Sequence, residues 1–189
     1  MRFLIFTVLL ILRSGAVLGA DASKYFPSSF DSFKEQWYSE QLRALGEAPM
    51  CCAKGATIHA YRFTWLRTFH RPVAISVSQD AKGNWAIHTK VTDGAGGYSP
   101  GKLVVNESRP LSADAAGALQ RLLEPGSSFW TLPSEDKERF GFDGSQWIVE
   151  ARSGDSYHYV DRWTPDKGPV RDIGLMFMKL SGKEFGKVY

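Results

Sequence analysis

Hydrophobic and polar side chains alternate along this chain with two different periods, and the period of about 3.6 residues predicts three helices. The first covers residues 28–45, and its apolar side is expected to face the protein interior. That side consists of Phe30, Phe33, Trp37, Leu42 and Leu45. The same period predicts a second helix over residues 112–124 and a third over residues 171–180. One apolar side on each helix is the pattern of helices that cover a sheet.

Short polar residues and a glycine mark the ends of the first helix. Ser32 with Glu35 has the spacing of a capping box, although residues 28–31 hold competing caps. Gly46 follows at the position where a left-handed residue would end the helix.

A period of two residues, which is typical of strands, follows the first helix. The strands that it predicts cover residues 57–66, 72–78, 85–91 and 102–106. Lys82-Gly83 lies between the second and third of these as a hairpin turn. Residues 93–101 contain four glycines and could form an anion-binding nest. Because a strand and not a helix follows them, a tight connector is the expected structure.

Two further strands, residues 146–152 and 156–163, are predicted to form an aromatic hairpin around Gly154-Asp155. A two-residue turn places Arg152 opposite Tyr157 and Glu150 opposite Tyr159. A three-residue turn would shift this register by one position and place His158 opposite Glu150 instead. In the two-residue register one face is polar and aromatic. It carries Glu150, Arg152, Tyr157, Tyr159, Asp161 and Trp163, whereas His158 lies on the other face.

These elements together predict an α+β fold. An antiparallel β-sheet, made of the meander and the aromatic hairpin, is expected to be covered by two or three helices. The chain has 189 residues, of which 43% are hydrophobic, 23% charged and 13% aromatic. This is enough apolar material for one core, so residues 23–189 are expected to form a single domain.

The first 22 residues have the composition of a signal peptide. An unbroken apolar run at residues 3–12 follows Arg2, and Ala20-Asp21-Ala22 has the A-x-A form of a cleavage site. We expect cleavage after Ala22, with Gly19 and Ala20 as alternatives. The mature chain is therefore predicted to be exported, to the periplasm or the exterior. No later apolar stretch is long enough for a membrane span.

Charge and cysteine content narrow the classes of partner. The formal net charge is +3 with the basic residues scattered, which argues against nucleic acid as the partner. Cys51 and Cys52 are adjacent and are the only two cysteines. They could remain reduced, form a strained vicinal disulfide, or bridge to another molecule or a soft metal. No standard zinc motif is present, and neither a resident metal nor a cofactor is predicted.

Standard nucleophile motifs are also missing from the sequence, including Gly-x-Ser-x-Gly. Glu150, His158 and Asp161 are the one cluster that could carry out acid–base chemistry. A cross-strand ladder of charged residues with a structural histidine explains the same residues without catalysis. The hydrolase hypothesis that uses this cluster is therefore kept as an alternative.

The leading hypothesis is a non-enzymatic binding or inhibitory protein, such as an immunity protein, that acts on an envelope or secreted protein partner. Its expected binding surface is the hairpin face with Arg152, Tyr157, Tyr159 and Trp163. Tyr, Trp and Arg are the residue types enriched in binding hot spots. A further alternative is a structural or assembly factor of the cell envelope, held by bridges from Cys51 and Cys52.

Overall fold

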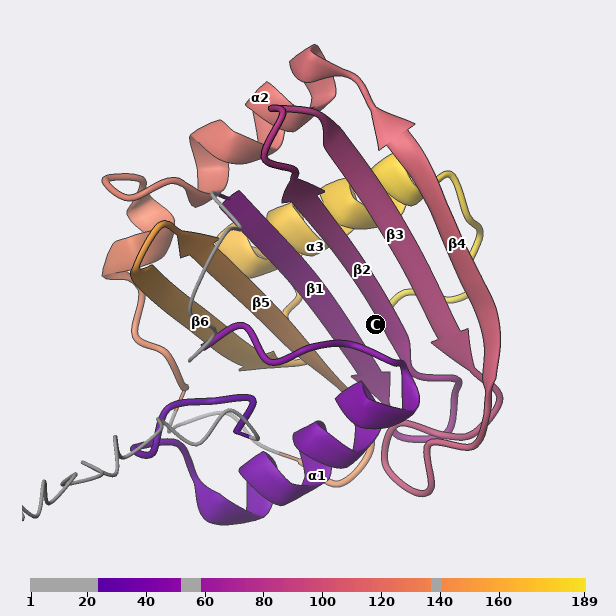
Figure 1. Cartoon of the computed structure of the whole chain (residues 1–189). Helices are drawn as coiled ribbons and strands as arrows, with labels where there is room; N and C mark the ends of the chain where they lie inside the picture. Colours follow the sequence, from indigo (N-terminus) through magenta and orange to yellow (C-terminus); the bar gives the residue numbers. More distant parts are fainter. Residues whose placement is uncertain (1–23, 52–58, 137–140) are drawn as a thin grey trace, which may run out of the picture.

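A computed structural model describes residues 24–51, 59–136 and 141–189 of the chain (Figure 1). Its strands are β1 (His59–Arg67), β2 (Val73–Gln79), β3 (Trp85–Thr92), β4 (Leu103–Leu111), β5 (Ser145–Ser153) and β6 (Ser156–Trp163). Its helices are α1 (Ser32–Ala44), α2 (Ala113–Leu123), the 3-10 helix η1 (Ser128–Thr131) and α3 (Pro169–Ser181). The strands form one six-stranded sheet in the order β4-β3-β2-β1-β5-β6, with antiparallel neighbours. The predicted α+β class is confirmed.

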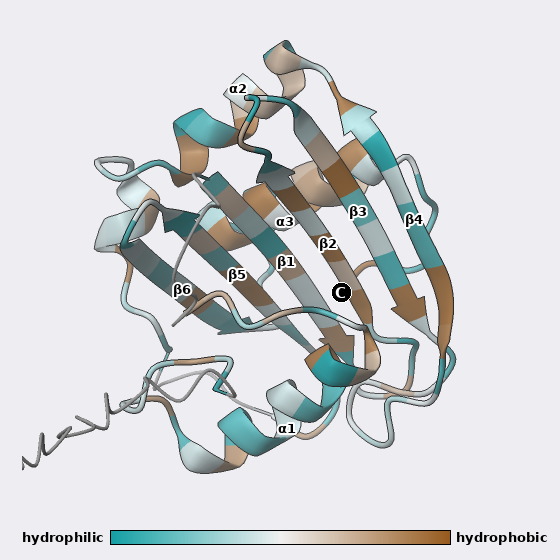
Figure 2. Ribbon diagram, viewed as in Figure 1, coloured by the Kyte–Doolittle hydropathy of each residue, from teal (hydrophilic) through white to brown (hydrophobic). Residues whose placement is uncertain are grey.

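Helices cover both faces of this sheet. In Figure 1, α3 lies behind the strands and α1 lies in front of them near their lower ends. Figure 2 shows hydrophobic and hydrophilic positions alternating along the central strands, so each strand sends side chains to both layers. We call the two sides of the sheet the α3 face and the α1 face.

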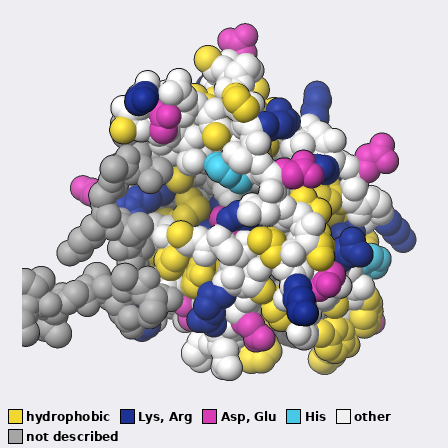
Figure 3. All heavy atoms as spheres, turned by 45° about the vertical axis from the view of Figure 1, so that its right-hand side comes forward, with side chains coloured by type: hydrophobic (Ala, Val, Ile, Leu, Met, Phe, Trp, Pro, Cys, Tyr) yellow, Lys and Arg dark blue, Asp and Glu magenta, His cyan; other side chains and the backbone are white. Residues whose placement is uncertain are grey.

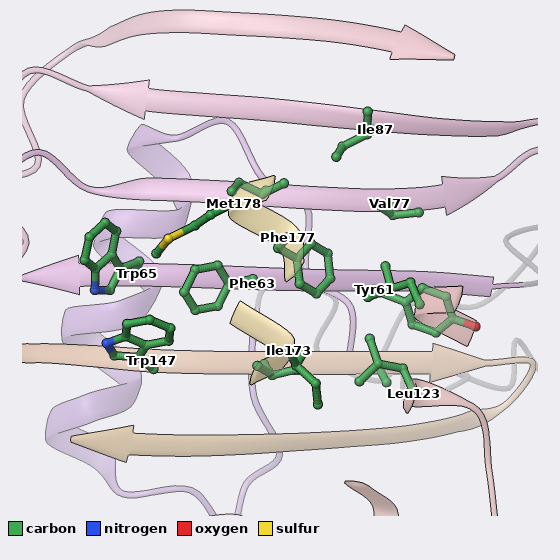
Figure 4. Close-up of a cluster of buried hydrophobic side chains, with 14 of the residues drawn as sticks. Tyr61, Phe63, Trp65, Val77, Ile87, Leu123, Trp147, Ile173, Phe177 and Met178 are labelled. Carbon is green, nitrogen blue, oxygen red and sulfur yellow. The ribbon is translucent and has the colours of Figure 1, made fainter. Parts of the chain in front are cut away.

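The main core lies on the α3 face. Aromatic side chains of β1 and β5 pack there under α3, as Figure 4 shows for Phe63, Trp147 and Phe177. Their ring centroids lie 5.2 Å (Phe63 to Trp147) and 6.1 Å (Phe63 to Phe177) apart. Gly174 of α3 lets the helix approach, since a Cβ atom there would lie 2.5 Å from Trp147 Cζ3. This core fixes the central strands from which the α1 face is built.

A smaller core lies on the α1 face. The segment before α1 places Tyr25, Phe26 and Phe30 over the hairpin, where Phe26 and Phe30 pack edge-on against Tyr159. Asp31 accepts a hydrogen bond from Lys34 N and so caps α1. One of the competing caps, Asp31, is therefore the N-cap, and the predicted capping box of Ser32 with Glu35 is not the start of the helix.

The structure differs from the sequence predictions for Phe33 and for the end of β4. Phe33 was expected on the buried side of α1, but 72% of it is exposed. The chain after α3 is docked on the domain, since Phe185 packs against the main core and its carbonyl accepts a hydrogen bond from Arg67 Nη1. Strand β4 is longer than predicted and ends at Leu111, because an edge strand accommodates Pro110.

The connector over residues 93–101 has the tight structure that was predicted. Gly96 N donates to His70 O, and Gly97 N donates to Thr68 O. A Cβ atom at Gly96 would lie 2.7 Å from the backbone of Arg67, so a side chain would not fit. These amides are used within the fold and are not available as an anion nest.

Some predictions fall outside the described residues. The proposed signal peptide, residues 1–22, lies there, and so does Cys52. Cys51 is half-buried at the end of the described segment, and the disulfide stays a prediction. In the part of the chain that the structure describes, no helix has the length and apolar character needed to cross a bilayer.

Candidate functional site

The register of the aromatic hairpin is the one that a two-residue turn predicts. Arg152 pairs with Tyr157, Glu150 with Tyr159 and Ile148 with Asp161. The expectation that this face is exposed is wrong, because Arg152 and Tyr159 are each only 6% exposed. Burial raises the pKa of the Tyr159 phenol to about 12. Tyr157 and Trp163 are half-buried, so the predicted binding surface lies mostly under the α1 layer.

Glu150 holds a buried guanidinium and does not face a cleft. Arg62 Nε lies 2.6 Å from Glu150 Oε2, and Arg62 Nη2 lies 2.8 Å from Glu150 Oε1. Both side chains are fully buried, and Tyr157 OH donates to Glu150 Oε1 over 2.9 Å. Arg62 Nη1 also donates to Ala48 O and pairs with Glu47. This network fastens the segment after α1 to the sheet.

His158 lies on the opposite face from Glu150 and Asp161. Its ring stacks on Trp130 at a centroid distance of 5.6 Å and meets Phe129 edge-on at 5.1 Å. Burial among these rings lowers the pKa of His158. The fold therefore does not bring the three residues of the hydrolase hypothesis together. Among the described residues, no group of three or more His, Cys, Asp or Glu is arranged to hold a metal ion.

A groove lined by exposed and half-buried aromatic side chains lies where α1 crosses one end of the sheet. We define this aromatic groove by Phe33 and Trp37 of α1, Tyr98 of the connector, and Phe142 and Trp163 beside β5 and β6. It consists of two adjoining hollows of about 620 Å³ each. Each of these volumes is within the range of natural ligand sites, about 300–1,000 Å³.

Hydrogen bonds from α1 hold the connector in place. Trp37 Nε1 donates to Gly96 O over 2.7 Å, and Gln41 Nε2 donates to Tyr98 O over 2.8 Å. The Tyr98 ring, 63% exposed, stacks on Phe69 at a centroid distance of 6.0 Å. The connector that forms this wall of the groove is therefore held in place by α1.

The opposite wall is formed by Trp163 at the end of β6 and by Phe142. The Trp163 ring lies against two glycines, because Cβ atoms would approach it to 2.8 Å at Gly141 and 2.5 Å at Gly144. Phe142 is 99% exposed. Figure 3 shows one face of the molecule, on which hydrophobic side chains gather at the lower right. Exposed rings at the mouth of a groove are a common sign of an interaction site.

The end of the groove near the start of α1 is acidic. We define this acidic end by Asp31, Glu135, Asp136 and Asp161, which line one hollow together with Lys34. Lys34 Nζ lies 2.9 Å from Asp161 Oδ2 and 3.1 Å from Glu135 Oε2.

Burial and charge shift the pKa values at this acidic end in opposite ways. Burial raises the pKa of the Asp161 carboxyl, and the Lys34 ammonium and the Tyr38 hydroxyl offset this only in part. Burial alone would lower the pKa of Lys34, but the neighbouring carboxylates of Asp161 and Glu135 have the larger effect and raise that pKa.

A somewhat larger hollow, of about 730 Å³, lies over β2, β3 and β4. Small and polar side chains such as Ser78, Ala86 and Ser108 form much of its lining. Trp85 is the one Phe, Tyr or Trp among the described residues that line it, so this hollow offers few of the side chains that dominate binding energies. The aromatic groove is therefore the stronger candidate site.

The comparisons with known proteins give no direct indication of function. No protein-family model matches this chain, and no curated protein has a matching sequence. The site must therefore be interpreted from its own chemistry.

Sequence reasoning identified Trp163 and Asp161 but missed most of the groove. Phe33 and Trp37 were assigned to the buried side of a helix, and Tyr98 to a connector. The signal that could have found Phe33 is its position within the first helical turn, two residues after the acidic N-cap Asp31 and on the opposite side of the helix from Leu42. Phe142 is distant in sequence from these residues, and only the fold brings it close.

Proposed function

We propose that this chain is an exported, non-enzymatic binding protein that holds an extended, basic segment of a protein partner in the aromatic groove. One observation carries this proposal, namely that the groove combines aromatic rings with a local excess of carboxylates. The described residues that line its two hollows include four carboxylates, besides Asp136, and one ammonium group. The four carboxylates are Asp31, Glu40, Glu135 and Asp161, and the ammonium belongs to Lys34.

The charge of the groove favours a cationic occupant over a neutral or acidic one. The whole chain has a formal net charge of +3, whereas the described residues that line the groove include more carboxylates than ammonium groups. Complementary charge speeds encounter and excludes partners of the wrong sign. A Lys or Arg side chain over an aromatic ring adds about 0.5–1 kcal/mol at an exposed site.

The shape of the groove favours an extended segment over a compact small molecule. The two hollows share Phe33, Trp37 and Trp163 in their linings and so adjoin along α1. An extended peptide spans several residues and can place alternate side chains in neighbouring hollows. An inhibitory protein of the immunity type would use such a groove to capture a basic loop of its target.

The test is a selection of random ten-residue peptides displayed on phage, with the purified mature chain as bait. We expect enrichment of peptides that combine Lys or Arg with aromatic or large apolar residues. The Phe33→Ser, Phe142→Ser double variant should bind the selected peptides about tenfold more weakly, as expected for two rings worth about 0.7 kcal/mol each. Both positions are exposed, so the variant is expected to fold normally.

Leu175→Ser is the matched control, because Leu175 is an exposed apolar residue on α3, across the sheet from the groove. It should keep full affinity. Enrichment of acidic peptides, no enrichment at all, or equal loss in the control would refute the proposal. Binding to a glycan array with the same dependence on Phe33 and Phe142 would replace the peptide with a carbohydrate.

A further inference from the structure

Asp161 has a buried carboxylate oxygen that lacks a hydrogen-bond donor among the described residues. The side chain is 1% exposed and lines the acidic end of the groove. Its Oδ2 atom accepts from Tyr38 OH over 3.0 Å and from Lys34 Nζ over 2.9 Å. Its Oδ1 atom is buried with no donor in the described part of the chain. An unsatisfied buried acceptor is costly, so a donor brought by a ligand would gain free energy here.

From this we propose that the acidic end is the seat of one Arg or Lys side chain of the partner segment, and that Lys34 is a resident cation which this side chain displaces from Glu135. The inference rests on the proposed function and specifies which end of the groove receives the cation. The incoming group would donate to Asp161 Oδ1 and pair with Glu135. A guanidinium suits this best, because its donors are spread over a rigid plane and can reach two carboxylates.

The two carboxylates are held at this spacing by the backbone. Asp161 N donates to Ser134 O over 2.7 Å, and an isolated parallel bridge joins Glu135 to Asp161. Arg162 Nη2 donates to Pro133 O over 2.7 Å, so the chain before Glu135 is tied to the edge of β6. The site is therefore preformed and does not need the ligand to assemble it.

Lys34 neutralises only part of the charge at this site. Its one ammonium is shared between the two carboxylates of Asp161 and Glu135. Replacing Lys34 by Met keeps much of the aliphatic stem that packs there but removes the competing cation. We therefore expect Lys34→Met to bind a basic peptide more tightly, whereas a purely structural lysine would give no gain.

The test uses the basic peptide most enriched in the phage selection, and a copy with each arginine replaced by the neutral isostere citrulline, or each lysine by acetyl-lysine. Affinities are measured by isothermal titration calorimetry. The neutral copy should bind wild type about tenfold more weakly, and Glu135→Gln should weaken the charged peptide by a similar factor. The two changes together should cost little more than one, because they remove the same contact. Lys34→Met should tighten binding of the charged peptide by about fivefold.

Glu107→Gln is the control for net charge, since Glu107 lies on β4 and is paired with Lys183. It changes the total charge as Glu135→Gln does but should leave affinity unchanged. Glu135 is preferred to Asp161 for substitution because its side chain is 25% exposed, and thermal melts check that each variant folds.

Equal binding of the charged and neutral peptides, an equal loss in Glu107→Gln, or weaker binding by Lys34→Met would each overturn the inference. Such outcomes would leave the proposed function standing, because a peptide would still bind the groove. If the selection enriches no peptide at all, the proposed function itself fails.

Discussion

Two glycines in helix interiors should respond to the same substitution with opposite signs. Ala is favoured over Gly in a helix by about 0.8–1.0 kcal/mol, and this gain applies equally at Gly117 in α2 and Gly174 in α3. At Gly117 a new Cβ atom would have its nearest neighbour at 3.7 Å, the end of the Arg121 side chain. Gly117→Ala should therefore stabilise the protein by about 0.5–1 kcal/mol.

At Gly174 the steric cost exceeds this gain. A Cβ atom would lie 2.5 Å and 2.6 Å from two carbons of Trp147 and 2.9 Å from Phe63 Cε2. Carbon atoms normally pack at about 3.5–4.0 Å, so one side must move by about 1 Å. Trp147 and Phe63 are fully buried in the main core and have no room to move. Overpacking of this kind costs about 1–3 kcal/mol or more, so the net effect of Gly174→Ala should be a loss of about 1–2 kcal/mol.

Urea unfolding followed by tryptophan fluorescence measures both effects. The midpoint should rise for Gly117→Ala and fall for Gly174→Ala, with unchanged slopes, since neither variant alters the surface exposed on unfolding. A Gly174→Ala variant as stable as wild type would mean that α3 leaves room for a Cβ atom beside Trp147. A loss of stability in both variants would refute the reasoning from helix propensity.

Three other predictions concern the ties that hold the layers together. Glu150→Ala should destabilise the protein by about 3–5 kcal/mol in urea unfolding, since it leaves the buried guanidinium of Arg62 with only part of its counter-charge; a loss below about 1 kcal/mol would contradict this. Burial alone would raise the pKa of Glu47, but Arg62 and Lys90 have the larger effect and hold that pKa below its usual value. Because the pKa of Glu47 is lower in the folded state than in the unfolded state, the Glu47 carboxylate contributes its full stability at a pH above its pKa in the unfolded chain. This stability is lost as the pH falls through its pKa in the folded protein. The free energy of unfolding should therefore fall less for Glu47→Gln than for wild type between pH 5 and pH 3, which is about the range around the reference pKa of Glu. An equal fall in the two proteins would contradict this prediction. Phe185→Ala should cost about 1–2 kcal/mol, because the ring packs on Trp65, and no change would show that the chain after α3 is not docked.

The part of the fold that follows from local pattern could be predicted from the sequence. A two-residue connection at Gly154-Asp155 fixes the register of β5 and β6, and this register determines that Tyr159 and Asp161 share one face while His158 lies on the other. Helix α3 and strand β2 follow in the same way from the periodicity of hydrophobic residues in their sequences. These features depend on neighbours in sequence, so they need no knowledge of the tertiary structure.

What covers each face could not be predicted, because periodicity shows which residues share a face but not what packs on it. Tyr159 is buried because Phe26 and Phe30, more than a hundred positions earlier in the sequence, lie over it. Phe33 is exposed because α1 makes much of its contact with the sheet through polar groups, including Tyr38 and Lys34 at Asp161. Hydrophobicity alone therefore assigned Phe30 and Phe33 to the same buried side.

The polar attachment of α1 explains why aromatic residues remain available for binding. A helix that buried Phe33 and Trp37 would satisfy its apolar side within the fold and leave no groove. Here Trp37 and Gln41 are used to brace the connector at Gly96 and Tyr98, and Lys34 reaches Asp161. The contacts that position α1 thus also set the two walls and the charged end of the groove. A ligand that competes for Asp161 and Glu135 would act on the same contacts, so binding at the acidic end and the packing of α1 are coupled.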